Sequence, residues 1–462
     1  MKRNDESPIP LDLPRRREFL RLSLATAGAV SLSGFLAAKG IAQPWLGDAA
    51  EEAATEEAAK HLKRSPFTDL SPLQAPDANG VMLPRGFSAR VVARSGQYCA
   101  PSPYVWHGAP DGGATFPTPE GGWVYVSNAE LGGGEGGVGA LRFDRHGQPV
   151  DAYPILEGTS TNCAGGPTPW NTWLSCEEHA SGLVWECDPF QACRGRGHVP
   201  KPRSLPALGA FAHEAVAVDP RERALYLTED AGGDGGGRVY RFECSKRDWP
   251  NGHARPRLEE GKLQVLRVRG VPDDVDLSAS PWAERIDLGR PQPVEWVDVV
   301  QPLQPQKAVR DSLRQSGSTP PGQHFPKAEG IWYFGGIVYF VTSYNHRIWA
   351  YDTHHETLEL VYDGKQGDPA KHTINEPDNL IVSPLGDILV AEDSGNLEIG
   401  VLKLEDGTSQ PLVRLVGHDD SEITGLALSP DGKRLYFSSQ RGTTGENGGG
   451  MVFEVLLPRA AA

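Results

Sequence analysis

Acidic residues, amides and one cysteine recur at the ends of short apolar runs in this chain of 462 residues. The polar residues that open such runs are Asn162, Cys163, His213, Glu214, Glu329, Asp378, Asn379 and Glu422. Those that close the following runs are Asn128, Glu130, Glu177, Glu178, Glu229, Asp230, Asn345, Glu392, Asp393, Gln440 and Arg441. Carboxylate and amide oxygens suit Ca²⁺, whereas a thiolate suits iron or zinc. If the fold brings these side chains together, they form a metal site with both kinds of ligand.

The apolar runs belong to a repeated unit. It consists of an apolar strand, a short turn, a second strand that ends in polar residues, a Gly-containing loop and a third, alternating strand. The second strands centre on residues 125, 173, 226, 339, 389 and 436, which are 48, 53, 113, 50 and 47 residues apart. Four of these steps match the ~40 to 50 residues of a four-stranded propeller blade. The pattern therefore predicts an all-β fold, a six-bladed β-propeller.

Propeller geometry places the polar ends together. The first two strands of each unit form a hairpin, so the start of one and the end of the other lie at the same rim. Carboxylates that converge there must be protonated, paired with bases or neutralised by cations, and few Lys or Arg occupy these positions. Cys163 stands in Asn-Cys-Ala-Gly-Gly, where small residues let the backbone approach a ligand. We therefore expect a metal site at the mouth of the central channel.

Composition excludes several other classes of protein. The 54 Gly and 39 Pro residues suit many turns and disfavour a helical bundle. A formal net charge of −15 disfavours nucleic acid and an anionic membrane surface as partners. The six cysteines contain no C-x-x-C pair, and the chain has no P-loop, H-E-x-x-H, G-x-S-x-G or EF-hand motif. These searches leave the strand-end residues as the best candidates for chemistry.

The amino-terminal segment is expected to be an export signal. Arg-Arg-Glu-Phe-Leu-Arg at residues 16–21 reads as a twin-arginine motif, and the apolar run 22–38 is too short and diluted for a membrane anchor. We predict a signal peptide over 1–42, an Ala/Glu-rich lead segment over 43–80 and the propeller over 81–462, with a Pro-rich insertion at 250–327 that forms a cap or a disordered loop. The expected location is the bacterial periplasm or outside the cell, and the expected partner is the twin-arginine export machinery.

Several segments together resemble the PhoX-type alkaline phosphatases. They are Ser-Asn-Ala-Glu at 127–130, Thr-Asn-Cys-Ala-Gly-Gly at 161–166, Thr-Pro-Trp-Asn-Thr-Trp-Leu-Ser-Cys-Glu-Glu at 168–178, His-Glu at 213–214, Glu-Pro-Asp-Asn-Leu at 376–380 and Ala-Glu-Asp at 391–393. The resemblance implies a six-bladed propeller with two Fe³⁺, two or three Ca²⁺, an oxide between metals and a cysteine among the iron ligands. It implies iron ligation by Cys163, Glu214 and Glu329, and calcium or substrate contacts by Asn128, Glu130, Glu178, Asp378, Glu392 and Asp393.

The expected activity is hydrolysis of a small-molecule phosphomonoester by a monomer. Lys327 fills the place where larger members of the family have an arginine that faces phosphate, so Lys327 and Asn128 are the predicted catalytic contacts. Two alternatives remain at this point. One is a lactonase-like calcium hydrolase, suggested by Glu376-Pro377-Asp378-Asn379 and the Ser-Pro-x-Gly turns at 383–386 and 429–432. The other is a non-catalytic calcium-binding propeller.

Overall fold

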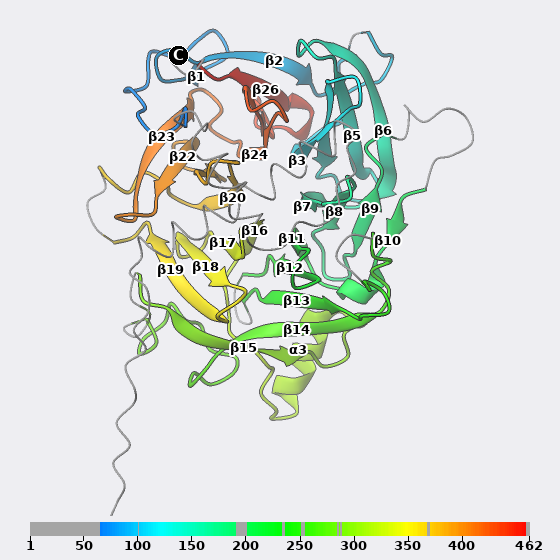
Figure 1. The fold of residues 1–462 in the computed structure, drawn as a ribbon, viewed down its shortest axis with the longest axis vertical. Coiled ribbons are helices and arrows are strands. Elements are labelled where there is room, and N and C mark those ends of the chain that lie inside the picture. Colours follow the sequence, from blue (N-terminus) through cyan, green and yellow to red (C-terminus); the bar gives the residue numbers. More distant parts are fainter. Residues whose placement is uncertain are drawn as a thin grey trace, which may run out of the picture.

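The computed structural model describes residues 65–458 apart from residues 100, 191–200, 233–235, 251–254, 284–285, 287–288 and 367–369. The predicted signal peptide, residues 1–42, and the first part of the predicted lead segment therefore lie outside the described residues. Within the described part, antiparallel sheets follow one another along the chain (Figure 1).

The first two sheets each have four strands in sequence order. The first consists of β3 (Pro110–Pro117), β4 (Trp123–Ala129), β5 (Gly136–Phe143) and β6 (Pro149–Thr159). The second consists of β7 (Asn162–Pro167), β8 (Trp173–Glu177), β9 (Val184–Cys187) and β10 (Arg203–Ser204). A 3₁₀ turn at Pro206–Leu208 leads to the next sheet.

The third sheet contains two runs of strands. One run is β11 (His213–Asp219), β12 (Ala224–Glu229), β13 (Val239–Cys244) and β14 (Gly261–Val268). The other is β16 (Ala328–Phe334), β17 (Ile337–Thr342), β18 (Arg347–Asp352) and β19 (Thr357–Asp363). Strand β15 (Gln292–Asp298) pairs with β14 on one side and β19 on the other. Because β14 is the fourth strand of its run, the chain added to the strand repeat begins after β14 and contains β15 and helix α3 (Gln306–Gln315).

The last two sheets take strands from the amino-terminal part of the described chain. One consists of β20 (Pro377–Val382), β21 (Ile388–Glu392), β22 (Glu398–Lys403) and β23 (Thr408–Leu415), with β1 (Val81–Met82) at its edge. The other consists of β24 (Ile423–Leu428), β25 (Arg434–Ser439) and β26 (Met451–Leu456), followed by β2 (Ser88–Arg94). A 3₁₀ turn at Asn447–Gly449 precedes β26. The pairing of β2 with β26 joins the two ends of the strand repeat.

The sheets are arranged around a centre, as in a propeller. Figure 1 shows the first strand of each run near the middle of the view and the later strands toward the periphery. The inner strands β3, β7, β11, β16, β20 and β24 each contact the next, and β24 contacts β3. Every predicted second-strand centre lies in a strand, so the predicted mostly-β, propeller-like fold is confirmed.

The strands are apolar on both faces because the sheets pack face to face. In β4 every residue from Trp123 to Ala129 is buried, and β17 is buried throughout. Such strands read as continuous apolar runs rather than as strict alternation. One core cluster joins Tyr125 and Leu141 of the first sheet to Ala427 and Tyr436 of the last, which closes the ring of sheets.

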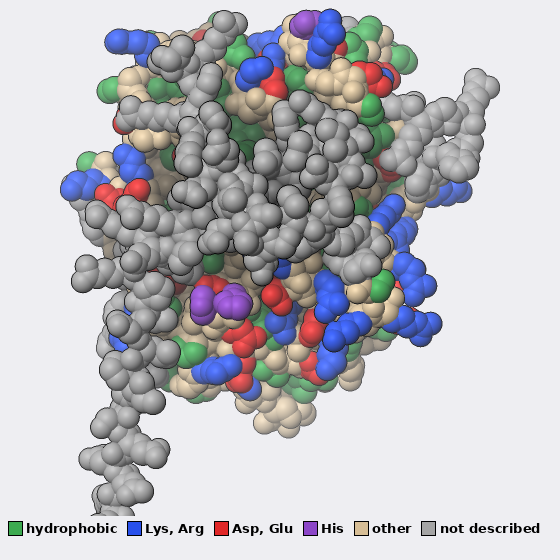
Figure 2. Space-filling model, in the orientation of Figure 1, with side chains coloured by type: hydrophobic (Ala, Val, Ile, Leu, Met, Phe, Trp, Pro, Cys, Tyr) green, Lys and Arg blue, Asp and Glu red, His purple; other side chains and the backbone are tan. Residues whose placement is uncertain are grey.

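The outer surface carries charges of both signs. Figure 2 shows Lys and Arg side chains beside Asp and Glu side chains along the lower part of the view, over β13 to β15. Arg267, for example, pairs with Glu295 at 2.9 Å and with Asp273 at 3.1 Å. No helix among the described residues is long and apolar enough to cross a membrane.

Tyr125 tests how much the ring depends on its closing contact. Its side chain is fully buried, its hydroxyl donates to the carbonyl of Gly425 at 3.1 Å, and its ring stacks on Tyr436 at 5.2 Å. We expect Tyr125→Phe to lower the free energy of unfolding by about 1 kcal/mol and Tyr125→Ala to lower it by about 3–5 kcal/mol. Urea denaturation measures both, with Tyr98→Ala as the control because Tyr98 is 73% exposed. Equal stability of Tyr125→Ala and Tyr98→Ala would contradict the closing role.

Candidate metal centre

The inner strands share an irregularity close to their first residues. The register shifts lie between Pro110 and Gly113 in β3, Asn162 and Gly165 in β7, His213 and Val216 in β11, Ala328 and Ile331 in β16, Pro377 and Leu380 in β20, and Thr424 and Ala427 in β24. A bulge of this kind changes the direction of a side chain. In five of the strands the first residue within the shift is an acid or the thiol, namely Asp111, Cys163, Glu214, Glu329 and Asp378. The same local irregularity, a β-bulge near the start of an inner strand, thus recurs at each of these five candidate ligands.

Together with Glu130, Glu178 and Glu422, these side chains form three groups of potential metal ligands among the described residues. The groups are Glu130 with Cys163 and Glu178, Asp111 with Glu130 and Glu422, and Glu214 with Glu329 and Asp378. Within each group one ligand atom per residue lies within 4.8 Å of the others. Glu130 belongs to two groups, and the Sγ of Cys163 lies 3.3 Å from Oε1 of Glu214 in the third. The three groups are therefore parts of one continuous site.

Burial and mutual repulsion keep protons on these carboxyl groups when no cation is present. Burial is the main cause, and neighbouring carboxylates add to it. Together they raise the pKa of Asp111 and of Glu329 to about 8 and the pKa of Glu178 to about 9. The same two causes, burial first, raise the pKa values of Glu214 and Asp378 well above their ordinary values. The carboxyl groups can therefore ionise together only when bound cations replace their protons.

The pKa of the Cys163 thiol is affected by burial and by the same neighbouring carboxylates. Burial, and then the charges of Asp111 and Glu214, raise the pKa of Cys163 well above its ordinary value. A thiol in this setting becomes a thiolate only when a bound cation replaces its proton. Cys163 is therefore suited to metal ligation and poorly suited to act as a free nucleophile.

Two cationic side chains border the acidic groups. The Nζ of Lys327 lies 3.4 Å from Oε1 of Glu329 and 3.9 Å from Oδ2 of Asp230. Burial acts to lower the pKa of Lys327, but the surrounding carboxylates outweigh it and raise that pKa, so the ammonium stays charged. Arg441 donates to Glu422 at 3.0 Å. Both side chains are about one-third exposed, at 36% and 32%, and can reach a ligand that enters from solvent.

Two buried oxygen atoms at the site have no hydrogen-bond partner. They are Oδ1 of Asp230 and Oε1 of Gln440. The amide nitrogen of Gln440 donates to Asp111 and to Glu130, each at 2.6 Å, which places this amide between two carboxylates. Buried acceptors without donors are costly in free energy. Their position beside the acidic groups is what a cation site requires.

The predicted site residues do not all lie in these groups. Glu130, Cys163, Glu178, Glu214, Glu329 and Asp378 do, and Lys327 borders them. Asp393 is in none of the three groups, although its charge raises the pKa of Asp378 and of Glu422. Glu392 instead accepts from the backbone N–H groups of Asn375 at 2.7 Å and Glu398 at 2.8 Å, which holds the loop after β21.

Asn128 has a different position from the one that a substrate contact needs. Its amide nitrogen donates to the carbonyls of Cys163 and Ala164 at 2.9 and 2.7 Å, and its amide oxygen accepts from Trp173 and Ser175 at 2.9 and 3.0 Å. The full hydrogen-bonding capacity of the side chain is thereby used within the protein. Asn128 therefore corrects one expectation: it positions the backbone of Cys163 and leaves no donor for a ligand.

Asp111 is the site residue that the sequence pattern missed. Its strand reads Pro-Asp-Gly-Gly-Ala-Thr-Phe-Pro, which contains no apolar run. Close packing of strands explains the glycine at position 112. A Cβ at Gly112 would lie 2.5 Å from Cα of Ala164, so β3 can approach β7 this closely only without a side chain there. An acid followed by glycines, one blade spacing before Cys163, is the signal that could have identified it.

Comparison with known proteins agrees with this architecture. The family model described as alkaline phosphatase PhoX matches residues 125–192 and 179–442. The structure of Pseudomonas fluorescens PhoX in complex with vanadate, a transition-state analogue, matches with a TM-score of 0.63 and 17% identity over 86% of this chain and 99% of that chain.

More distant structures also match. They include the gluconolactonase XC5397 from Xanthomonas campestris, with a TM-score of 0.40 and 12% identity over 84% of this chain and 99% of that chain. The calcium-binding protein regucalcin from Agrobacterium tumefaciens has a TM-score of 0.41 and 14% identity, over 81% of this chain and 96% of that chain. No curated protein sequence matches the chain. The family match spans well over half of the chain, and the chain therefore belongs to the PhoX family of alkaline phosphatases, which are phosphomonoesterases.

Proposed function

We propose that the protein hydrolyses small-molecule phosphomonoesters with two ferric ions and calcium ions, bound at the mouth of a six-bladed propeller. In this proposal the nine-stranded sheet counts as two blades joined by β15. The observation that carries the proposal is the convergence of one thiol and a set of buried carboxylates into three adjoining groups of ligand atoms. The structural likeness to a phosphatase that binds vanadate supports the choice of a phosphoryl substrate.

The donor atoms fit the two kinds of metal. Asp111, Glu130 and Glu422 offer only oxygen, and the orphaned Oε1 of Gln440 lies beside them, which suits Ca²⁺. Cys163, next to Glu214, adds the soft ligand that iron accepts and calcium does not. We assign Glu329 to the iron ligands with these two residues. Glu178 and Asp378, which complete the neighbouring groups, remain candidates for calcium.

The bound metals would supply Lewis-acid stabilisation of the charge that develops during phosphoryl transfer. The chain's own residues contribute binding and orientation. The ammonium of Lys327 stays protonated and can donate a hydrogen bond to a negatively charged phosphoryl oxygen. Arg441 offers a second cation that Glu422 orients, and its planar guanidinium suits a phosphate. Asn128 donates to the carbonyls of Cys163 and Ala164 and so fixes the backbone that carries the thiol.

Metal content separates this proposal from a calcium-only propeller. Elemental analysis of protein purified without chelator should find iron together with calcium. Calcium alone would favour the lactonase-like or non-catalytic alternative. We also propose export by the twin-arginine route, on the strength of residues 16–21, and cell fractionation with a Lys-Lys replacement of Arg16 and Arg17 tests it.

Replacing the thiol should remove the iron without unfolding the protein. Cys163→Ser exchanges a soft thiolate for a hydroxyl that is a poor anion at neutral pH, so we expect most of the iron and the phosphatase activity to be lost. Elemental analysis and circular dichroism measure the two effects separately. Cys99→Ser, at a buried thiol in a hydrophobic core cluster, is the control and should keep its iron. Full iron and full activity in Cys163→Ser would show that sulfur is not a ligand.

Removing the lysine should leave the metals in place and weaken phosphate binding. Lys327→Ala loses one charge-assisted hydrogen bond of ~1.5 to 3 kcal/mol, so we expect turnover and phosphate affinity to fall by ~10- to 100-fold. Lys327→Arg keeps the charge and is the matched control. Steady-state kinetics with phosphate as inhibitor, together with metal analysis, give the answer. Unchanged phosphate inhibition in Lys327→Ala would rule out the contact.

The raised carboxyl pKa values predict the pH dependence of stability in protein stripped of metal. Asp111, Glu329 and Glu178 hold protons up to a pH of about 8 to 9 when folded, whereas their ordinary pKa values are 3.8, 4.5 and 4.5. Between these limits the folded state binds more protons than the unfolded state, so its stability falls as pH rises. We expect the Tm of chelator-treated protein to drop between about pH 5 and pH 9, and the metal-loaded protein to resist this drop. Equal Tm values of stripped protein at pH 5 and pH 9 would show that these carboxyl groups do not hold extra protons in the folded state.

A further inference from the structure

Helix α3 lies in the chain segment added after β14. Its Arg310 contacts Glu229, the last residue of β12. The guanidinium of Arg310 donates to Oε1 of Glu229 at 2.6 Å and to the hydroxyl of Tyr240 at 2.8 Å. Tyr240 in turn donates to Oε2 of Glu229 at 2.9 Å. Both charged side chains are buried, at 5% and 2% exposure. The last residue of β12 is thus fixed from the helix.

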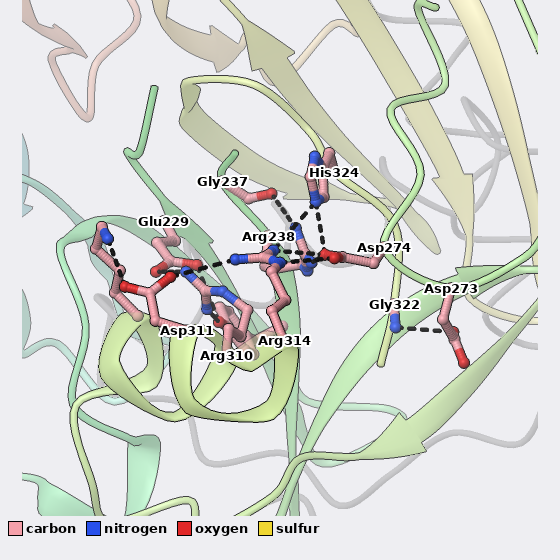
Figure 3. A network of polar contacts seen from close by, with 12 residues as sticks. Glu229, Gly237, Arg238, Asp273, Asp274, Arg310, Asp311, Arg314, Gly322 and His324 are labelled. Carbon is pink, nitrogen blue, oxygen red and sulfur yellow. Dashed lines mark hydrogen bonds and ion pairs between the residues drawn. The ribbon is translucent and has the colours of Figure 1, made fainter. Parts of the chain in front are cut away.

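A second arginine of α3, Arg314, forms an ion pair with Asp274. Arg314 donates from Nε to Oδ2 at 2.7 Å and from Nη2 to Oδ1 at 2.6 Å, which is a bidentate pair. Arg238 also reaches Oδ1, at 2.6 Å, and Nε2 of His324 lies 2.7 Å from it. Figure 3 shows these side chains converging on Asp274, with α3 below them. The carboxylate is therefore the shared partner of α3, the residue just before β13 and the segment that leads into β16.

Glu229 and His324, the residues held by these two networks, both lie close in sequence to residues of the candidate metal centre. Glu229 precedes Asp230, and His324 precedes Lys327 by three residues. The two segments are joined to each other: the N–H of Lys327 donates to the carbonyl of Ala231 at 3.2 Å, and the N–H of Phe325 donates to Gly237 at 2.9 Å. The network behind the site thus determines where the Lys327 segment lies.

The backbone of Lys327 needs such support. Its φ is +50°, a left-handed conformation that a lysine adopts at a cost in free energy. Its carbonyl accepts from the N–H of Ser343 at 3.0 Å, so the residue is held on both sides. Because the local preference of the chain opposes this conformation, surrounding contacts must maintain it.

We propose that Arg314 is a positioning residue for Lys327, acting through Asp274 and His324, so that helix α3 sets the phosphate affinity of a site that Arg314 does not itself enter. The proposal rests on the proposed function, in which Lys327 binds the phosphoryl group. Arg314 suits a test because Asp274 keeps Arg238 and His324 as partners when Arg314 is replaced. Arg310 suits it less, since its removal leaves Glu229 charged and buried.

The experiment uses the metal-loaded full chain with Arg314→Met. We expect KM for p-nitrophenyl phosphate and the inhibition constant of inorganic phosphate to rise about tenfold, with metal content unchanged. We also expect faster hydrogen exchange at the amides of Phe325 and Lys327. The matched control is Lys307→Met, on the exposed side of the same helix, where Lys307 pairs only with Asp311 in the described contacts. Its kinetics and exchange should equal those of the wild type.

The possible outcomes distinguish failure of the Arg314 proposal from failure of the proposed phosphatase function. Wild-type phosphate inhibition and wild-type exchange in Arg314→Met would overturn it, and so would a lower Tm with neither of these changed, because the role would then be structural. Loss of metal in Arg314→Met would also overturn it. If the metal-loaded wild type neither hydrolyses the ester nor binds phosphate, the proposed function fails. The exchange comparison then still decides whether Arg314 holds the Lys327 segment.

Discussion

Repulsion among buried carboxylates is the constraint on which the rest of this structure depends. Two unit charges about 4 Å apart repel by about 4 kcal/mol at an effective dielectric of about 20. The site holds three adjoining groups of such residues, and a whole domain is stable by only about 5–15 kcal/mol. The protein can therefore keep this arrangement only with protons or metal ions in it, and the strand framework must be rigid enough to hold the ligands while their charge is neutralised.

Close contacts between the inner strands give the framework this rigidity. Each inner strand contacts its neighbours around the ring, and small residues at the contacts allow the backbones to approach. Gly330, for example, lies so close to β20 that a Cβ would be 2.7 Å from the carbonyl of Asp378. The bulge near the start of five of the six inner strands then sets the direction of one candidate ligand. Rigidity comes from the sheets, and the direction of the ligands comes from the irregularities.

Much of the fold could be predicted from the sequence, because strands buried on both faces leave continuous apolar runs at a regular spacing. The strand-end rule also selected Cys163, Glu214, Glu329 and Asp378, side chains that the structure brings close together. It missed Asp111, whose strand is built from glycines for close packing and so lacks the apolar signal. It misjudged Asn128, since the sequence does not reveal that four partners within the protein use its amide. The α3 network was beyond prediction for a related reason: its members come from positions 229 to 324, and only the folded chain brings them together.

The pairing of β2 with β26 has a consequence for how the protein is made. Arg90 on β2 contacts Glu454 on β26, 364 residues later in the chain. A contact of this sequence separation carries a large loop-closure entropy and forms slowly. The ring therefore cannot close until the ribosome has released the last strand. Gln440 and Arg441 follow β25, upstream of β26, so a chain cut short before residue 440 lacks both the closure and one side of the site. Ring closure in this way depends on the synthesis of β26.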